Sequence, residues 1–359
     1  MLYREAGQFK TSYAADQQIF PILQDRIGIG LIAVLALGVL PLFATEYLTT
    51  TILIPFLVMS IAAIGLNILT GYAGQLSLGT GGFMATGAFA AYKLSTMFPD
   101  LNIVFVFLGS GVITAFVGVM FGIPSLRIKG FYLAVATLAA QFFLLWLFNK
   151  VPWFTNYSSS GVISAPPRAI FGDIMVTGSS AHYTAKYPFL LVFVGLLALA
   201  AKNLTRCHLG RAWMAIRDMD IAAEIIGIKP LQTKLSAFAI SSLYCGIAGA
   251  AWGFIYTGSV EPLAFSIEIS FKVLFMVIIG GLGSILGSFF GAAFMVLLPV
   301  ILTNAPHLLG LNIPVDMISH LEYMIFGALI IFFLIVEPHG LARLWQIGKE
   351  KLRLWPFPY

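Results

Sequence analysis

The feature that most constrains this chain is a series of long apolar runs separated by short polar segments. A run of about 20 apolar residues can cross the roughly 30 Å hydrocarbon core of a bilayer as a helix. A helix also satisfies its own backbone hydrogen bonds in lipid, which an irregular lipid-exposed chain cannot do. We therefore predict about ten transmembrane helices, one of them broken, at residues 27–45, 48–69, 72–92, 102–123, 131–149, 188–202, 235–258, 264–281, 284–303 and 318–336.

Composition excludes a water-soluble protein. Of the 359 residues, 59% are hydrophobic and 10% are charged, whereas soluble domains have about 45–50% and about 25%. So few charges cannot coat a soluble protein of this size. The low hydrophobicity and high net charge of disordered chains are also absent. Because the chain has only Cys207 and Cys245, it offers no disulfide framework. The predicted fold class is an all-α integral membrane protein.

Lysine and arginine residues set the predicted orientation, because cytoplasmic loops carry the excess of these residues. With both termini inside the cell, fifteen of the twenty Lys and Arg residues fall in interior segments. We divide the chain into a cytoplasmic leader (1–26), a transmembrane domain (27–336) and a cytoplasmic tail (337–359). The leader lacks the short apolar core and the cleavage site of a signal peptide, so we expect it to be retained.

A long connection at 151–187 lies on the exterior side in this orientation. It is rich in Ser, Gly and Pro, and aromatic residues border it. Two interpretations are open. The segment is either a solvated cap with aromatic side chains at the membrane interface or a docking surface for an external partner.

The most informative segment is the interior connection at 203–234. Its apolar residues recur at helical spacing with charged residues between them, which predicts an amphipathic helix that ends at Gly227. Burying its eight charges in hydrocarbon would cost on the order of 20 kcal/mol, so we expect it to lie outside the bilayer. Such a helix either rests on the membrane surface or inserts into a groove of a soluble partner. Its mixture of acidic and basic residues favours a partner over anionic lipid.

A glycine-rich segment follows the second predicted helix. Six glycines fall between Gly71 and Gly87, with polar side chains among them. Broken helices occur in membranes where the freed backbone is buried in protein or lines a cavity, so the segment marks a candidate translocation path. The alternative is close packing of helices through small residues, which we favour for the other glycine pairs. The candidate path residues are Asn67, Gln75, Ser77 and Thr80.

Motifs for catalysis and metal binding are missing from the sequence. It contains no H-E-x-x-H, G-x-S-x-G or G-x-x-x-x-G-K-[ST] pattern, and its five histidines do not cluster with carboxylates or cysteines. We therefore expect no catalytic residues, no metal and no cofactor, and any nucleotide chemistry must come from another chain. Few acidic residues fall within the spans, which argues against an ion-driven carrier. A self-sufficient channel or secondary carrier and a membrane enzyme remain the alternatives.

Three motifs in order resemble the LivM-type permease family of bacterial ATP-binding-cassette importers for branched-chain amino acids. They are NILTGYAGQLSLGTGGFMATGAF at 67–89, GRAWMAIRDMDIAAEIIGI at 210–228 and IGGLGSILGSFFGAAF at 279–294. The resemblance implies a heteromeric importer in the bacterial inner membrane, with a second homologous permease, two ATP-binding subunits and a periplasmic solute-binding protein. It implies lipid but no nucleic acid as a further partner.

The same resemblance assigns a role to the interior connection. The second motif is similar to the coupling loop that docks in a cleft of the ATP-hydrolysing subunit. The residues carried over are Arg217, Asp218, Asp220, Ala222, Ala223, Glu224 and Gly227. We expect Arg217 to face acidic groups of that subunit and Glu224 to face basic ones.

Substrate choice is left open by the resemblance. The implied solute is a branched-chain or other amino acid, but relatives carry urea, amides or aromatic acids. The sequence departs from the family pattern at Tyr157 and Ser158, where glycine character is expected. The charged leader and the aromatic C-terminal tail look like additions to the family pattern.

Overall fold

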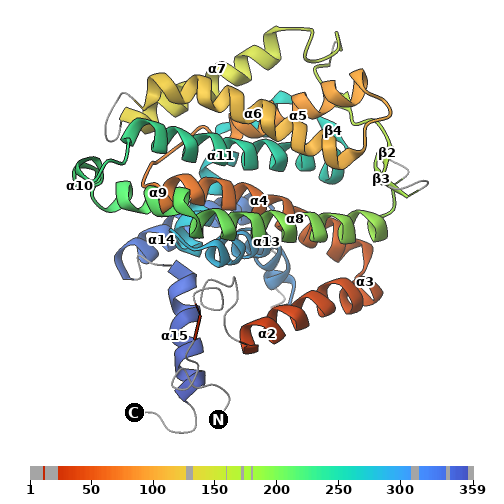
Figure 1. Cartoon of the computed structure of the whole chain (residues 1–359). Coiled ribbons are helices and arrows are strands. Elements are labelled where there is room, and N and C mark those ends of the chain that lie inside the picture. Colours follow the sequence, from red (N-terminus) through yellow and green to blue (C-terminus); the bar gives the residue numbers. More distant parts are fainter. Residues whose placement is uncertain are drawn as a thin grey trace.

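The structure is a computed structural model that describes residues 11–12, 23–126, 132–158, 160–170, 174–178, 181–308, 315–336 and 340–354. Figure 1 shows a bundle of long helices, most of which run side by side. Several contain a short π-helical turn, and one begins with a 3-10 turn. The helical elements are α2 (Leu23–Val34), η1 (Leu35–Val39), α3 (Leu40–Phe43), η2 (Leu48–Leu53), α4 (Ile54–Asn67), η3 (Ile68–Tyr72), α5 (Thr80–Met97), α6 (Ile103–Ser125), α7 (Tyr132–Lys150), α8 (Tyr183–Arg206), α9 (His208–Asp218), α10 (Asp220–Ile225), α11 (Pro230–Ala251), η4 (Trp252–Tyr256), η5 (Pro262–Phe265), α12 (Ile267–Gly280), α13 (Ile285–Leu308), α14 (Val315–Val336) and α15 (Gly340–Leu354).

Each predicted span coincides with a helix. Within the described part of the chain, eight helical segments are long and apolar enough to cross a bilayer. The other two predicted spans correspond to α5 and α14. The fold class of an all-α integral membrane protein is confirmed. The prediction of a helix over 72–92 was wrong at its start, because α5 begins only at Thr80.

The core of the bundle lies where α4, α5 and α11 meet. Thirteen of the fourteen residues of α4 are buried, and α5 packs directly on α11. A Cβ on Gly87 would overlap the backbone of Gly246, and one on Gly249 would overlap the backbone of Met84. The two helices therefore approach closely only because these positions lack side chains. Small-residue packing, predicted for Gly249, is confirmed there.

The two ends of the bundle carry different structures. The segment predicted as an exterior loop ends at residue 182, because α8 begins at Tyr183. It contains the strands β1 (Ile163–Ser164), β2 (Arg168–Ala169) and β3 (Met175–Thr177). Strands β2 and β3 form an antiparallel hairpin, and β1 pairs antiparallel with β4 (Ser259–Val260). We call this the hairpin end and the opposite end, which carries α9 and α10, the α10 end (Figure 1).

The segment at the hairpin end folds onto the bundle. The guanidinium of Arg168 donates to the carbonyl of Ser95 in α5, and the Asn102 amide donates to the Ile170 carbonyl at 2.7 Å. Asn156 and Tyr157 adopt left-handed backbone conformations, with φ of 51° and 59°. Because glycine adopts such conformations most easily, the position where Tyr157 departs from the family pattern does have a glycine-like backbone.

The chain ends match the predicted divisions only in part. Of the leader, residues 11–12 and 23–26 are described, and Leu23–Arg26 already belong to α2, so the rest of that prediction lies outside the described residues. The tail contains the helix α15. Residues 355–359, which include most of the aromatic C-terminal motif, also lie outside the description.

Candidate functional site

The broken helix is the first part of the site. After η3 the chain runs without helical structure from residue 73 to residue 79 and then enters α5. Burial alternates along this stretch, because Ala73, Gln75, Ser77 and Gly79 are buried and the residues between them are more exposed. A period of two is the pattern of extended chain. The predicted break in the glycine-rich segment is confirmed, and alternate residues along it are buried in the protein.

Gln141 joins the two helices that begin beside this break. It is the tenth of the nineteen residues of α7 and is fully buried. Its carbonyl oxygen accepts from the backbone N–H of Gly82 in α5 and from the Ser270 hydroxyl in α12. Its amide nitrogen donates to the Phe265 carbonyl at 2.9 Å, just before α12. The N-termini of α5 and α12 therefore meet at the middle of α7.

This meeting has an electrostatic consequence. The first N–H groups of a helix have no partner within the helix and carry a partial positive charge. Two such ends facing one buried amide side chain form a polar centre within an apolar bundle. The Ser270 hydroxyl also accepts from the Gly81 N–H at 2.8 Å, and the Thr137 hydroxyl accepts from the Leu78 N–H at 2.9 Å. Side chains of α7 and α12 thus accept hydrogen bonds from N–H groups of the break and of the first turn of α5.

Asn67 takes a structural position at the end of α4. Its amide nitrogen donates to the Ser284 carbonyl at 2.8 Å and to the Ser288 hydroxyl at 2.9 Å. Its amide oxygen accepts from the Gly283 N–H at 2.8 Å. These bonds hold the turn between α12 and α13 against α4. Asn67 has its hydrogen-bonding capacity engaged by this turn, so we do not place it on the path.

The other predicted path residues lie along the break. Thr80 is buried at the first position of α5, and the Ser77 hydroxyl accepts from the Gly79 N–H at 3.3 Å. Gln75 is only 4% exposed. Neither the nitrogen nor the oxygen of its amide has a hydrogen-bond partner among the described residues. A buried amide without partners is costly, which makes Gln75 the residue that most requires an explanation.

The interior connection forms two helices, so the prediction of one amphipathic helix was wrong. It spans residues 207–229, because α8 extends to Arg206 and α11 begins at Pro230. The chain is extended at Met219 (φ −153°, ψ 95°), between α9 and α10. Asp220 lies in the first turn of α10, where a carboxylate favours a helix start. The stop at Gly227 is confirmed by its φ of 92°.

The two helices differ in how they contact the bundle. Helix α9 buries Ala212, Trp213 and Ile216, and the Trp213 indole donates to the Ser236 hydroxyl of α11 at 2.9 Å. Of α10 only Ala223 is buried. Two of the apolar residues that recur at helical spacing in this connection are exposed, Met219 by 70% and Ile226 by 74%. Figure 1 shows α10 at the extreme end of the molecule.

Arg217 links the interior connection to the broken helix. Its Nη1 donates to the Gly71 carbonyl at 2.9 Å, and its Nε pairs with Asp218 at 2.8 Å. Its aliphatic stem passes Gly74, where a Cβ would lie 2.9 Å from the Arg217 Cγ. Gly74 also has a φ of 68°. The structure therefore places Arg217 against its own chain, where the sequence predicted a contact with a partner.

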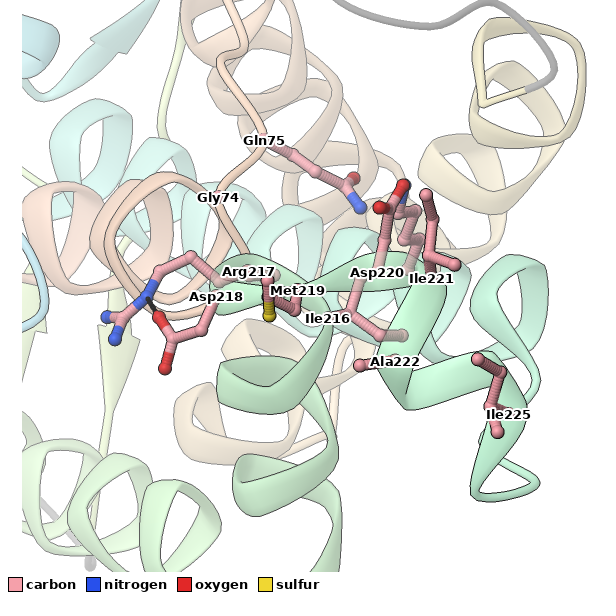
Figure 2. A pocket seen from close by; sticks show the side chains of 12 residues that line it. Gly74, Gln75, Ile216, Arg217, Asp218, Met219, Asp220, Ile221, Ala222 and Ile225 are labelled. Carbon is pink, nitrogen blue, oxygen red and sulfur yellow. Dashed lines mark hydrogen bonds and ion pairs between the residues drawn. The ribbon is translucent and has the colours of Figure 1, made fainter.

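A cavity of about 590 Å³ separates the two parts of the site. Its walls come from the break and from the residues around α10. Figure 2 shows the Gln75 amide and the Asp220 carboxylate directed toward one another, with Arg217 and Asp218 to one side. The lining residues are Ala73, Gly74, Gln75, Ile216, Arg217, Asp218, Met219, Asp220, Ile221, Ala222, Ile225 and Lys234.

The predicted coupling residues fall into distinct environments. Asp218, Asp220, Ala222, Glu224 and Gly227 are exposed, whereas Ala223 is buried. Within the described ranges, no group of three His, Cys, Asp or Glu residues could hold a metal ion. Sequence reasoning missed Gln141, Thr137 and Ser270. Gln141 is the only glutamine within its predicted span, and a polar residue in an apolar run is the signal that could have identified it.

Comparison with known proteins gives a consistent result. Residues 48–334 match the family described as the permease component of branched-chain amino acid transport systems. This match covers most of the chain, including the broken helix, α9 and α10. The chain belongs to this permease family. No solved structure matches it.

Individual relatives carry different solutes in their names. The high-affinity branched-chain amino acid transport system permease protein LivM of Escherichia coli K12 is 29% identical over 87% of this chain and 74% of its own length. The nucleoside ABC transporter permease protein NupB of Lactococcus lactis is 24% identical over 74% of this chain and 72% of its own. The fructose import permease protein FrcC of Rhizobium meliloti is 34% identical over 29% of this chain and 30% of its own.

The different surroundings of the two buried glutamines predict opposite effects on stability. Interhelical hydrogen bonds in membrane proteins contribute about 0.6–2 kcal/mol each. Gln141→Leu leaves three partners unpaired, so we expect it to lower the free energy of unfolding by about 2–4 kcal/mol. Gln75→Met removes an amide that bonds to nothing described, so we expect no loss or a small gain. Unfolding of the purified permease in detergent measures both, and a destabilised Gln75→Met protein would contradict this assignment.

Proposed function

We propose that this chain is the transmembrane subunit of an ATP-driven importer, and that it moves a small polar solute across the bacterial inner membrane by alternating access. In this proposal the subunit assembles with a second homologous permease, two ATP-binding subunits and a periplasmic solute-binding protein. The α10 end and both termini face the cytoplasm, and the hairpin end faces the binding protein. The observation that carries the proposal is the exposed α10, which Arg217 links to the broken helix.

The exposed face of α10 supports docking of a soluble subunit. Ile221, Ile225 and Ile226 are 73%, 81% and 74% exposed, and they project from the end of the molecule. Large aliphatic side chains that project this far are expected to enter a groove of a partner. Glu224 adds a charge beside them. ATP hydrolysis has to occur on that partner, since the sequence lacks a phosphate-binding loop.

Movement of the docked helix has a direct route into the bundle. Helix α9 is held to α11 through Trp213, and Arg217 at its end holds the Gly71 carbonyl. Gly71 lies in the last turn of η3, just before the break, and it also approaches Gly283. A displacement of α10 by the ATP-binding subunits therefore reaches both the break and the α12–α13 turn. Coupling of this kind requires different contacts in the two states.

The cavity supplies the proposed cytoplasmic end of the path. Gln75 points into it, and Ser77 and Thr80 follow along the break toward the polar centre at Gln141. The rim carries charges of both signs, and isoleucine side chains complete the lining. Such a lining suits a zwitterion with an apolar side chain, as in a branched-chain amino acid. Urea, amides and aromatic acids remain alternative solutes.

The first test concerns docking. Ile225→Asp places a charge in the centre of the exposed apolar face, so we expect it to abolish co-purification with the ATP-binding subunits and ATP-driven uptake. Membrane insertion should be unchanged because Ile225 makes little contact with the bundle. Ile174→Asp, an exposed isoleucine at the hairpin end, is the matched control and should retain association. Normal association of Ile225→Asp would exclude α10 as the docking element.

The second test concerns the path. If the Gln75 amide bonds to the solute, Gln75→Met should reduce the rate of uptake at least about tenfold, since a hydrogen bond made only to a passing solute contributes on the order of 1.5 kcal/mol. The ATP-binding subunits should still associate, because Gln75 is not on the exposed face of α10. Uptake by vesicles that contain the whole assembly measures the effect. An unchanged uptake rate would remove Gln75 from the path.

The third test separates the importer from a self-sufficient carrier or channel. Liposomes that contain only the two permeases should accumulate no labelled leucine. Addition of the ATP-binding subunits, the binding protein and ATP should start accumulation. Solute flux through the permease alone would favour a carrier or channel. Accumulation of urea, an amide or an aromatic acid in place of leucine would support the same mechanism with a different solute.

A further inference from the structure

Helix α15 differs from the spans in direction. Figure 1 shows it running crosswise to α4, α8 and α11, below the rest of the bundle. Because the spans cross the membrane, a helix perpendicular to them lies parallel to the membrane plane. It is fifteen residues long, so an apolar face along it would extend over about 22 Å of surface.

Two contacts fix the level of α15 relative to the bundle. Gly340 packs on the α12–α13 turn, where a Cβ at this position would lie 2.6 Å from the Ile279 carbonyl oxygen. The ring of Trp345 lies 5.7 Å from that of Phe290. Phe290 is the sixth residue of α13, about 7.5 Å along the helix axis from its start. Trp345 is therefore near the depth at which tryptophan side chains concentrate in membrane interfaces.

The residues of α15 are segregated around its axis. At 100° per residue, Leu341, Leu344, Trp345 and Gly348 lie on one face. Leu341 packs against the core, but Leu344 is 49% exposed and Trp345 is 55% exposed, so the described part of the bundle covers this face only in part. Arg343, Gln346 and Glu350 lie on the opposite face.

Helix α15 is strongly basic. The sequence of the helix holds four basic residues and one acidic residue. Lys349 and Lys351 flank the apolar face on its two sides, the positions from which a lysine stem can cover apolar surface while its ammonium reaches lipid phosphates. This pattern is unlike that of α9 and α10, in which acidic residues accompany the basic ones.

We propose that α15 lies in the membrane interface at the α10 end of the bundle and binds anionic phospholipids. Leu344 and Trp345 enter the boundary between headgroups and acyl chains, and Lys349 and Lys351 contact the phosphates. The bound lipids fix the position of α15. Because Gly340 packs on the α12–α13 turn, to which Asn67 is hydrogen-bonded, they also stabilise the position of that turn. This interaction is independent of the solute and of ATP, so it can be tested separately from the proposed import function.

Spin labels on the full-length protein test the position of the helix. Leu344→Cys and Gln346→Cys are both exposed and lie on opposite faces, in a background that carries Cys207→Ser. In vesicles of phosphatidylcholine and phosphatidylglycerol, the label at 344 should be accessible to oxygen and the label at 346 to a water-soluble nickel chelate. Equal access of the chelate to both labels would overturn the proposal. Protection of both labels from both reagents after addition of the second permease would mean a protein interface, and would also overturn it.

Lipid specificity is tested by a single charge. Titration of the detergent-solubilised protein with brominated phosphatidylglycerol should quench the part of the fluorescence that is lost in Trp345→Phe. Each basic residue near an anionic surface changes affinity about fivefold, so Lys351→Gln should raise the half-saturating lipid concentration by about that factor. Lys229→Gln, which removes one exposed charge from the interior connection at the same end, should leave it unchanged. Equal quenching by brominated phosphatidylcholine, or no effect of Lys351→Gln, would refute anionic lipid binding.

Discussion

The arrangement of this protein depends on the need to satisfy backbone groups inside an apolar bundle. Residues 73–79 are not helical, so most of their N–H and carbonyl groups lack the bonds that a helix would provide, although the N–H groups of Ala73 and Gln75 still donate to carbonyls of η3. The N-termini of α5 and α12 have the same deficiency. In the break and in the first turn of α5, three N–H groups donate to side chains of neighbouring helices: Leu78 to Thr137, Gly81 to Ser270 and Gly82 to Gln141. The break is stable because side chains from two neighbouring helices take the place of helical hydrogen bonds.

Two polar residues near the break differ in whether their side-chain amides are hydrogen-bonded. Asn67 bonds to four groups of the α12–α13 region, so it fixes the position of one helix against another. Gln75 bonds to no described group although it is almost fully buried. Such an amide is unusual, because most buried polar groups in proteins are hydrogen-bonded. Both residues come from the same motif, yet of the two only Asn67 has its amide hydrogen-bonded to other described residues.

Much of the fold could be predicted from the sequence because lipid imposes a simple requirement on length and apolarity. The ten apolar runs located the helices, and the glycines between Gly71 and Gly82 located the break. The start of α5 could not be predicted in this way, since the apolar run continues through residues 72–79 and the contacts that hold this stretch out of a helix, such as that of Leu78 with Thr137, are long-range. The spacing of apolar residues also predicted one helix in place of α9 and α10, because a single extended residue such as Met219 does not interrupt that spacing. The centre at Gln141 depends on residues from α5, α7 and α12, which are distant in sequence.

The distribution of charge links these observations. The charged residues of α9 and α10 serve two surfaces, because Arg217 turns inward to the Gly71 carbonyl while Glu224 and the isoleucines turn outward. Arg217 lies at the end of α9, and its guanidinium donates to the Gly71 carbonyl of η3, so one side chain joins the two elements. In the proposed importer, force applied to α10 would therefore reach the break through Arg217, as well as α11 through Trp213. The short extended segment, which has neither helical bonds nor a covering helix of its own, is the part that can change most easily in response.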